Sequence, residues 1–117
     1  MDKAKAIFNY VRDKVKYSGY YNTKYGAVGT LTLKKGNCVD LAHLLVAMYR
    51  AANLKSRYVH GTCHFESGYI GHVWAQVLVG NTWICADASN DINSFGKIKN
   101  WNTNSYSFHS RYSSLPF

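Results

Sequence analysis

Proline, acidic side chains and long apolar runs are scarce in this chain of 117 residues, and each scarcity excludes a class of protein. One proline and no low-complexity run argue against a disordered or linker-like chain. No apolar stretch reaches the length of a membrane span, and no secretory hydrophobic segment follows Met1. We therefore expect a single globular domain, residues 1–117, with a core of its own.

Cysteine is also sparse. The three cysteines, Cys38, Cys63 and Cys85, form an odd set without a C-x-x-C pair. That pattern excludes a disulfide scaffold and a cysteine-rich zinc site, and it favours a reducing or anoxic setting. We expect no metal ligands among them.

The few acidic residues leave a formal charge of +8, from 14 Lys and Arg against 6 Asp and Glu. A positive field favours polyanionic partners such as nucleic acid, an acidic wall polymer or anionic lipid. Ten tyrosines would suit a nucleic-acid platform, but the basic residues are scattered, and the densest run fits the solvated face of one helix. We therefore expect no nucleic-acid partner, and we read the charge as solubility or attraction to an acidic substrate.

Hydrophobic periodicity predicts an α+β fold. A segment that is apolar nearly all round predicts a buried central helix, and a later run of alternating residues predicts an antiparallel meander. Asp2 and Asn53 are the expected start and stop signals of the two helices. The expected elements are a helix over 3–16, an extended loop over 17–32, a helix over 38–52, a strand over 57–65, a turn over 66–71, a hairpin over 72–89 and a weaker strand in the tail.

The stretch Gly36-Asn37-Cys38 places a thiol at the mouth of the buried helix. Asn37 is a preferred N-cap, so Cys38 falls in the first turn, where backbone amides and the helix dipole stabilise a thiolate. The Cys38 amide itself is a natural oxyanion donor, whereas Asn37 and the loop tyrosines are only guesses for a second one. A small buried hydrophobe is an equally common use of cysteine. A nucleophile would need a histidine base with an orienting group.

The chain has five histidines, and the hairpin singles out one of them. His43 lies on the wrong side of the helix for Cys38, and we expect it to be structural. The other four are His60 and His64 on one strand, as surface or metal-binding residues, His109 in the weakly patterned tail, and His72.

The two-residue turn Gly80-Asn81 sets the register of the hairpin. Val79 then pairs with Thr82, and one chemically mixed face carries His72, Trp74, Gln76, Leu78, Trp83, Cys85, Asp87 and Ser89. His72 and Asp87 become diagonal neighbours about 7 Å apart at the backbone, which a hydrogen bond between the side chains can close. If this mixed face packs on the Cys38 helix, His72 can reach the thiol.

Three blocks in this order resemble the transglutaminase-like superfamily of cysteine enzymes. They are "GNCVDLAHLLVAMYRAA", "GHVWAQVLVGNTW" and "WICADAS". More narrowly, "YNTKYGAVGTL" and "NSFGKIKNWNT" look like the catalytic domain of pseudomurein endoisopeptidases and related domains of methanogenic archaea and their viruses. The resemblance implies a papain-like α+β core with the catalytic residues Cys38, His72 and Asp87, one from each block.

The resemblance also implies a substrate and a setting. It implies a thiol hydrolase that cuts the isopeptide bond between alanine and a lysine side-chain amine in pseudomurein cross-links, helped by divalent cations, although the sequence itself requires no cofactor. The implied domain is a monomer cut from a longer chain with wall-binding repeats. With no signal peptide in view, it would be made in the cytoplasm and reach the archaeal wall at lysis.

Two other functions stay open. Animal transglutaminases carry Trp after the catalytic cysteine, whereas this chain has Val39, which weakens the case for transamidation in the animal manner. An acyl transferase that uses an amine in place of water would share all steps up to the acceptor. A non-catalytic wall-binding domain would have no need of all three triad residues.

Overall fold

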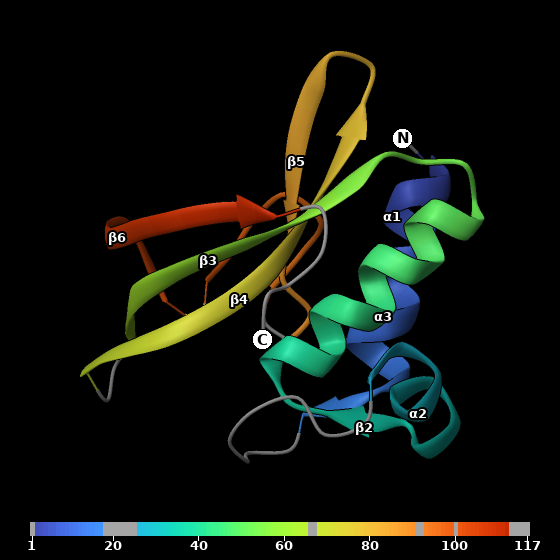
Figure 1. Ribbon diagram of the computed structural model, residues 1–117, viewed down its shortest axis with the longest axis horizontal. Helices are drawn as coiled ribbons and strands as arrows, with labels where there is room; N and C mark the ends of the chain where they lie inside the picture. Colours follow the sequence, from blue (N-terminus) through green and yellow to red (C-terminus); the bar gives the residue numbers. More distant parts are fainter. Residues whose placement is uncertain (1, 18–25, 66–67, 91–92, 100, 113–117) are drawn as a thin grey trace.

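A computed structural model of the chain describes residues 2–17, 26–65, 68–90, 93–99 and 101–112, with the backbone alone for residues 2, 64–65, 69–70, 102–110 and 112. Helices gather on one side of the described part and a curved antiparallel sheet forms the other (Figure 1). The elements are α1 (Asp2–Lys14), β1 (Lys16–Tyr17), α2 (Gly26–Leu33), β2 (Lys35–Gly36), α3 (Cys38–Ala51), β3 (Ser56–Phe65), β4 (Gly68–Val79), β5 (Thr82–Ala86) and β6 (Asn102–Tyr112). The predicted α+β class is confirmed.

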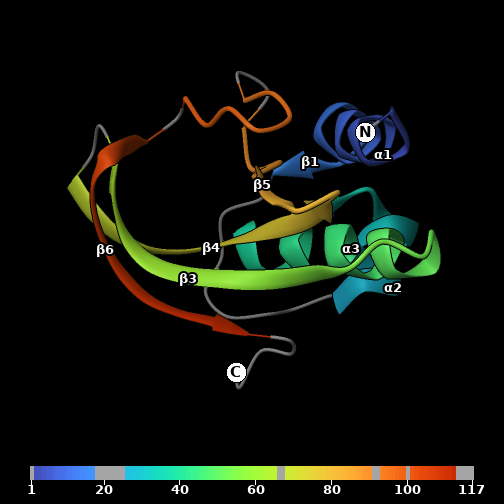
Figure 2. The same ribbon diagram turned by 90° about the horizontal axis from the view of Figure 1, so that it is seen from above.

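The sheet has the order β5-β4-β3-β6, so three consecutive strands form a meander and β6 returns to the free edge of β3. Figure 2 shows the long β3, β4 and β6 curving together past the helices. The hairpin register is confirmed, with Val79 opposite Thr82 and Gln76 opposite Cys85. Pairing stops at Ala75 opposite Ala86, because β5 ends there. Asp87 therefore follows the strand and does not extend the ladder.

Helix α3 is the centre of the core, as its apolar sequence predicts. Asn37 caps it by accepting a hydrogen bond from the Asp40 backbone amide, at 2.9 Å. At the other end Asn53 takes a left-handed φ of 63°, the conformation that Asn tolerates at a helix stop. Both predicted boundary residues are confirmed.

The face of the sheet that packs on α3 is the apolar one, so the condition that the mixed face packs there is not met. Val73, Ala75 and Val77 share one buried cluster with the leucines of α3. Trp74, on the opposite face, belongs to a second buried cluster with Val59, Cys63 and Trp101. The reason is hydrophobic burial, since a helix that is apolar all round gains most from the uniformly apolar face.

Both predicted ends of the first helix and the predicted start of the hairpin are wrong, and one helix was not predicted. The first helix already begins at Asp2, which is thus not its N-cap, and it ends at Lys14. Strand β4 begins at Gly68, inside the predicted turn. Most of the predicted loop after residue 25 is the helix α2, whose two glycines and two threonines have weak helix propensity.

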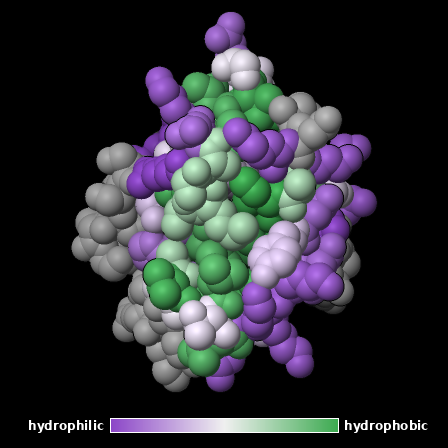
Figure 3. Space-filling view, turned by 90° about the vertical axis from the view of Figure 1, so that its right-hand side faces the viewer, coloured by the Kyte–Doolittle hydropathy of each residue, from purple (hydrophilic) through white to green (hydrophobic). Residues whose placement is uncertain are grey.

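Packing on α3 explains why α2 forms despite that sequence. Thr30 is fully buried, and the Gly26 amide donates to the Asp40 carboxylate on α3 at 3.0 Å. Tertiary contacts of this kind outweigh local propensity in a short helix. The outer side of α2 exposes Val28, Leu31 and Leu33, and the view of the helical side shows apolar surface bordered by hydrophilic side chains (Figure 3). Within the described residues, no helix is long and apolar enough to cross a membrane.

Candidate active site

The thiol of Cys38 lies at the first residue of α3 and is half-buried. The chain reaches it through β2, which pairs in parallel with β1 and sets Tyr17 opposite Gly36. Gly36 fits closely, because a Cβ there would lie 2.9 Å from the Cβ of Asp40. The Cys38 amide belongs to the first helical turn, where no preceding carbonyl within the helix accepts from it. An electron-rich oxygen near the thiol can therefore accept from that amide.

His72 and Asp87 form a buried pair. The His72 Nε2 lies 2.7 Å from the Asp87 Oδ2, and the two side chains are 5% and 2% exposed. The diagonal contact expected from the hairpin register is present, although Asp87 lies one residue beyond β5. The side chains close the gap between their backbones because both lie on the same side of the sheet.

Asp87 is held on both oxygens. Its Oδ2 also accepts from the Trp101 indole N–H at 2.9 Å, and its Oδ1 accepts from the Ser89 amide at 3.0 Å and the Ser89 hydroxyl at 2.6 Å. Burial raises the pKa of Asp87, but the His72 charge and the bonds from His72, Ser89 and Trp101 outweigh it and lower that pKa to about 2. The carboxylate is therefore ionised at neutral pH.

His72 is shifted the opposite way. Burial lowers its pKa, whereas the Asp87 charge, the Asp87 hydrogen bond and the Cys38 thiol together raise it to about 10. The two shifts have the same origin, since each charge stabilises the other in a poorly hydrated site. The pair favours an imidazolium facing a carboxylate.

The structure also brings Cys38 close to His72, and the thiol helps to raise the pKa of that imidazole. Since Nε2 is directed at Asp87, Nδ1 is the ring nitrogen left for the thiol. The two residues meet at the first turn of α3, where Cys38 is half-buried at the edge of the core cluster. His72 therefore reaches the thiol without the mixed face covering the helix.

Two of the residues that fix Asp87 were not expected from the sequence. The indole of Trp101 packs edge-on to the His72 ring with centroids 6.0 Å apart, and Trp74 stacks on the same ring at 5.9 Å. The sequence contains a local signal for Ser89, because Asp-x-Ser favours a side-chain-to-backbone turn. It contains no such signal for Trp101, since this residue comes from the segment between β5 and β6 and reaches Asp87 only through the fold.

The other histidines do not join this group in the described part of the chain. The His43 Nδ1 lies 2.9 Å from the Tyr58 hydroxyl, in keeping with a structural role. The side chains of His64 and His109 lie outside the described residues. Within the described residues no group of three or more His, Cys, Asp or Glu side chains could hold a metal ion.

The remaining cysteines differ from Cys38 in their surroundings. Cys63 is fully buried, and burial, followed by the charges of Asp87 and Cys38, raises its thiol pKa to about 12. Cys85 lies on β5, where its sulfur accepts from the Gln76 amide at 3.6 Å. Of the three thiols, Cys38 is the one that raises the pKa of His72.

The model of the transglutaminase-like superfamily matches residues 1–88 of this chain. The chain belongs to the transglutaminase-like superfamily. The matched region contains Cys38, His72 and Asp87, whereas Ser89 and Trp101 lie beyond it. The superfamily pattern thus includes helix α3 and the β4–β5 hairpin but not Ser89 and Trp101, which bond to Asp87.

Two solved structures are similar to this transglutaminase-like chain. A candidate cysteine protease from Cytophaga hutchinsonii is 25% identical, with a TM-score of 0.66 over 97% of this chain and 46% of its own. A TGase is 22% identical, with a TM-score of 0.62 over 79% of this chain and 27% of its own. This chain spans about half the length of the first. None of the curated proteins compared with it matches. The fold is therefore transglutaminase-like, and membership of this superfamily supports thiol-based acyl chemistry.

Proposed function

We propose that this domain is a cysteine endoisopeptidase that hydrolyses the bond between alanine and a lysine side-chain amine in pseudomurein cross-links. The observation that carries the proposal is the contact of Cys38 with a His72 that is itself bonded to the ionised Asp87. That arrangement has the three roles of an acyl-transfer triad, namely nucleophile, base and orienting group. The substrate assignment rests on the sequence blocks that resemble the pseudomurein endoisopeptidases.

Each residue has one role in the acylation step. The Cys38 sulfur attacks the isopeptide carbonyl carbon, and its electron pair forms the new C–S bond. The oxyanion that develops accepts from the Cys38 amide at the start of α3. As the C–N bond breaks, the proton on His72 Nδ1 passes to the departing lysine amine. Asp87 keeps Nε2 as the donor and stabilises the imidazolium throughout.

Hydrolysis of the thioester reverses these roles. Neutral His72 accepts a proton from water, the hydroxyl oxygen bonds to the acyl carbon, and the C–S bond breaks to release a free acid and the Cys38 thiolate. An amine in place of water would give a transferase by the same steps. The acceptor that reaches the thioester therefore decides between hydrolysis and transfer.

The deciding experiment uses a synthetic peptide with an alanine–ε-lysine isopeptide bond and a small primary amine as competing acceptor. We expect the wild type to release free acid, seen by mass spectrometry, and Cys38→Ala to release none. Cys85→Ala is the matched control, since the Cys85 sulfur is bonded to the Gln76 amide, and it should retain turnover. A dominant amine adduct would replace the hydrolase with a transferase.

A second readout tests the nucleophile without substrate. Native protein treated with iodoacetamide should be alkylated at Cys38 well before Cys63, whose thiol is buried and has a raised pKa. Equal rates, together with no cleavage of the peptide, would contradict the assignment and favour a non-catalytic wall-binding domain.

A further inference from the structure

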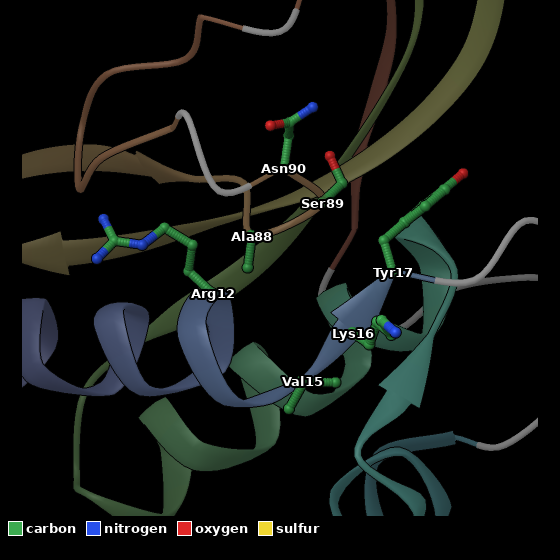
Figure 4. Close-up of a pocket in the computed structure, with 7 residues that line it drawn as sticks. All are labelled: Arg12, Val15, Lys16, Tyr17, Ala88, Ser89 and Asn90. Atoms are coloured by element: carbon green, nitrogen blue, oxygen red, sulfur yellow. The ribbon is translucent and has the colours of Figure 1, made fainter.

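A pocket of about 340 Å³ lies between the end of α1, strand β1 and the turn after β5. Figure 4 draws its lining, with Arg12 and Val15 at the end of α1, Lys16 and Tyr17 on β1, and Ala88, Ser89 and Asn90 on the facing turn. None of these residues is used as an acid, base or nucleophile in the reaction above. The pocket is thus a separate space that needs its own explanation.

The pocket adjoins the triad on two sides. Ser89, in its wall, donates to Asp87 through both its amide and its hydroxyl. Tyr17 lies opposite Gly36, two residues before Cys38. Burial, followed by the charges of Cys38 and Asp87, raises the pKa of Tyr17. A substrate group bound in the pocket would therefore belong to a part of the substrate next to the isopeptide bond that is cut.

The lining selects for negative charge. Arg12 and Lys16 are its charged members, and none of the described lining residues is acidic. The Arg12 guanidinium is fixed by Asp13, at 2.7 and 3.0 Å, and by the Asn93 carbonyl at 3.1 Å, so part of its charge is balanced. The Lys16 side chain is exposed and forms no ion pair with the described residues. Lys16 is thus the main cation offered to a ligand.

The remaining lining groups match a planar oxygen anion. The Tyr17 hydroxyl and the Asn90 amide carry hydrogen-bond donors, whereas the Ser89 hydroxyl already donates to Asp87. A carboxylate accepts on both of its oxygens. A cationic or purely apolar group would meet Lys16 without compensation. The last turn of α1 carries Arg12 and Lys14, which offset the partial negative charge of its terminal carbonyls.

We propose that this pocket binds a carboxylate of the substrate located next to the scissile isopeptide bond, with Lys16 as its counter-ion. The inference rests on the proposed function and narrows its substrate class to isopeptide-linked chains that carry a free carboxylate beside the bond. The overall charge of +8 strengthens attraction to such acidic chains.

The test compares two isopeptide substrates that differ only in a carboxylate or a carboxamide beside the cleaved bond. The variant is Lys16→Glu, and the matched control is Lys5→Glu, an equal charge change on the exposed side of α1. Lys5 is seven residues before Arg12, about 10 Å along the helix at about 1.5 Å per residue. Both variants lower the net charge equally, so they separate a local contact from the general field.

We expect wild type to favour the carboxylate substrate by roughly tenfold in kcat/KM, the scale of one charge-assisted contact. Lys16→Glu should bring that ratio to about one or below, and Lys5→Glu should stay within about twofold of wild type. A wild-type kcat/KM ratio near one, or an equal loss of that ratio in both variants, overturns the proposal that the pocket binds a carboxylate.

Direct binding separates failure of the pocket from failure of the proposed activity. The dissociation constants of both peptides are measured on Cys38→Ala, with and without Lys16→Glu. Tighter binding of the carboxylate peptide that depends on Lys16 supports the pocket even if wild type cleaves neither peptide. Equal binding of the two peptides overturns it even if both are cleaved.

Discussion

Replacing Asp87 with Asn tests the central pair with almost no change in size. The carboxylate accepts four hydrogen bonds, from His72, Trp101 and twice from Ser89. An amide has one oxygen and one NH₂ group, so it cannot accept on both sides. If its oxygen faces Ser89, its NH₂ meets the Trp101 N–H and turns His72 Nε2 into an acceptor. The proton then moves to Nδ1, where it blocks proton transfer from the thiol.

The size of the effect follows from the charge that is lost. The pKa of His72 lies at about 10 against an ordinary 6.5. At about 1.36 kcal/mol per pH unit that difference is on the order of 5 kcal/mol in favour of the imidazolium. Without the carboxylate, burial lowers the pKa of His72 and only the neighbouring Cys38 raises it, so the imidazolium loses its main stabilising charge. We expect turnover to fall by about 10²- to 10⁴-fold, as for other triads that lose the orienting carboxylate.

Two assays follow Asp87→Asn. Cleavage of the isopeptide gives the loss of turnover, and iodoacetamide alkylation of Cys38 at pH 6.5 reports the thiolate directly and should slow at least about tenfold. Asp13→Asn removes an exposed charge on α1 and is the control expected to alkylate like wild type. A folded Asp87→Asn protein with wild-type alkylation at pH 6.5 would refute the reasoning, because the thiolate would then not depend on the pair.

Three further expectations concern the surroundings of this pair. Trp101→Phe removes one hydrogen bond to Asp87 and should raise the pKa of the acid limb of the pH–rate profile while leaving KM unchanged. A pH–rate profile identical to that of wild type would show that the indole only packs against the pair. Gly36→Ala places a Cβ 2.9 Å from that of Asp40, so the unfolding free energy should drop by about 1–3 kcal/mol in urea titrations, and an unchanged value would contradict the close fit. The pKa of His72 is raised from 6.5 to about 10, and that of Asp87 is lowered from 3.8 to about 2. The pair therefore contributes its full stabilisation between pH 3.8 and pH 6.5, the ordinary pKa values of the two groups. It should decline as pH rises from 6.5 towards 10 and as pH falls from 3.8 towards 2, and a wild-type minus Asp87→Asn stability difference that is constant with pH would contradict the pairing.

Local chemistry explains what could be predicted from the sequence. Asn37 and Asn53 define α3 because a side-chain cap and a left-handed stop act within a few residues. Gly80-Asn81 defines the hairpin register because a two-residue turn leaves one pairing of the strands. From that register alone, His72 and Asp87 become neighbours.

Contacts between distant segments account for what the sequence did not predict. Helix α2 has weak propensity and forms by packing on α3, so no local pattern reveals it. Trp101 reaches Asp87 only after the chain has crossed from β5 towards β6. The face of the hairpin that covers α3 likewise depends on which face gains more free energy on burial, and that is the apolar face.

The sequence by itself thus determined the helix that carries Cys38, the hairpin that carries His72 and the proximity of Asp87, because caps, turns and alternation act over a few residues. Only the tertiary structure decided how the thiol meets the imidazole, what fixes the carboxylate and where the Lys16 pocket opens. Those features depend on side chains far apart in the chain, and burial and charge bring them together only once the core has formed.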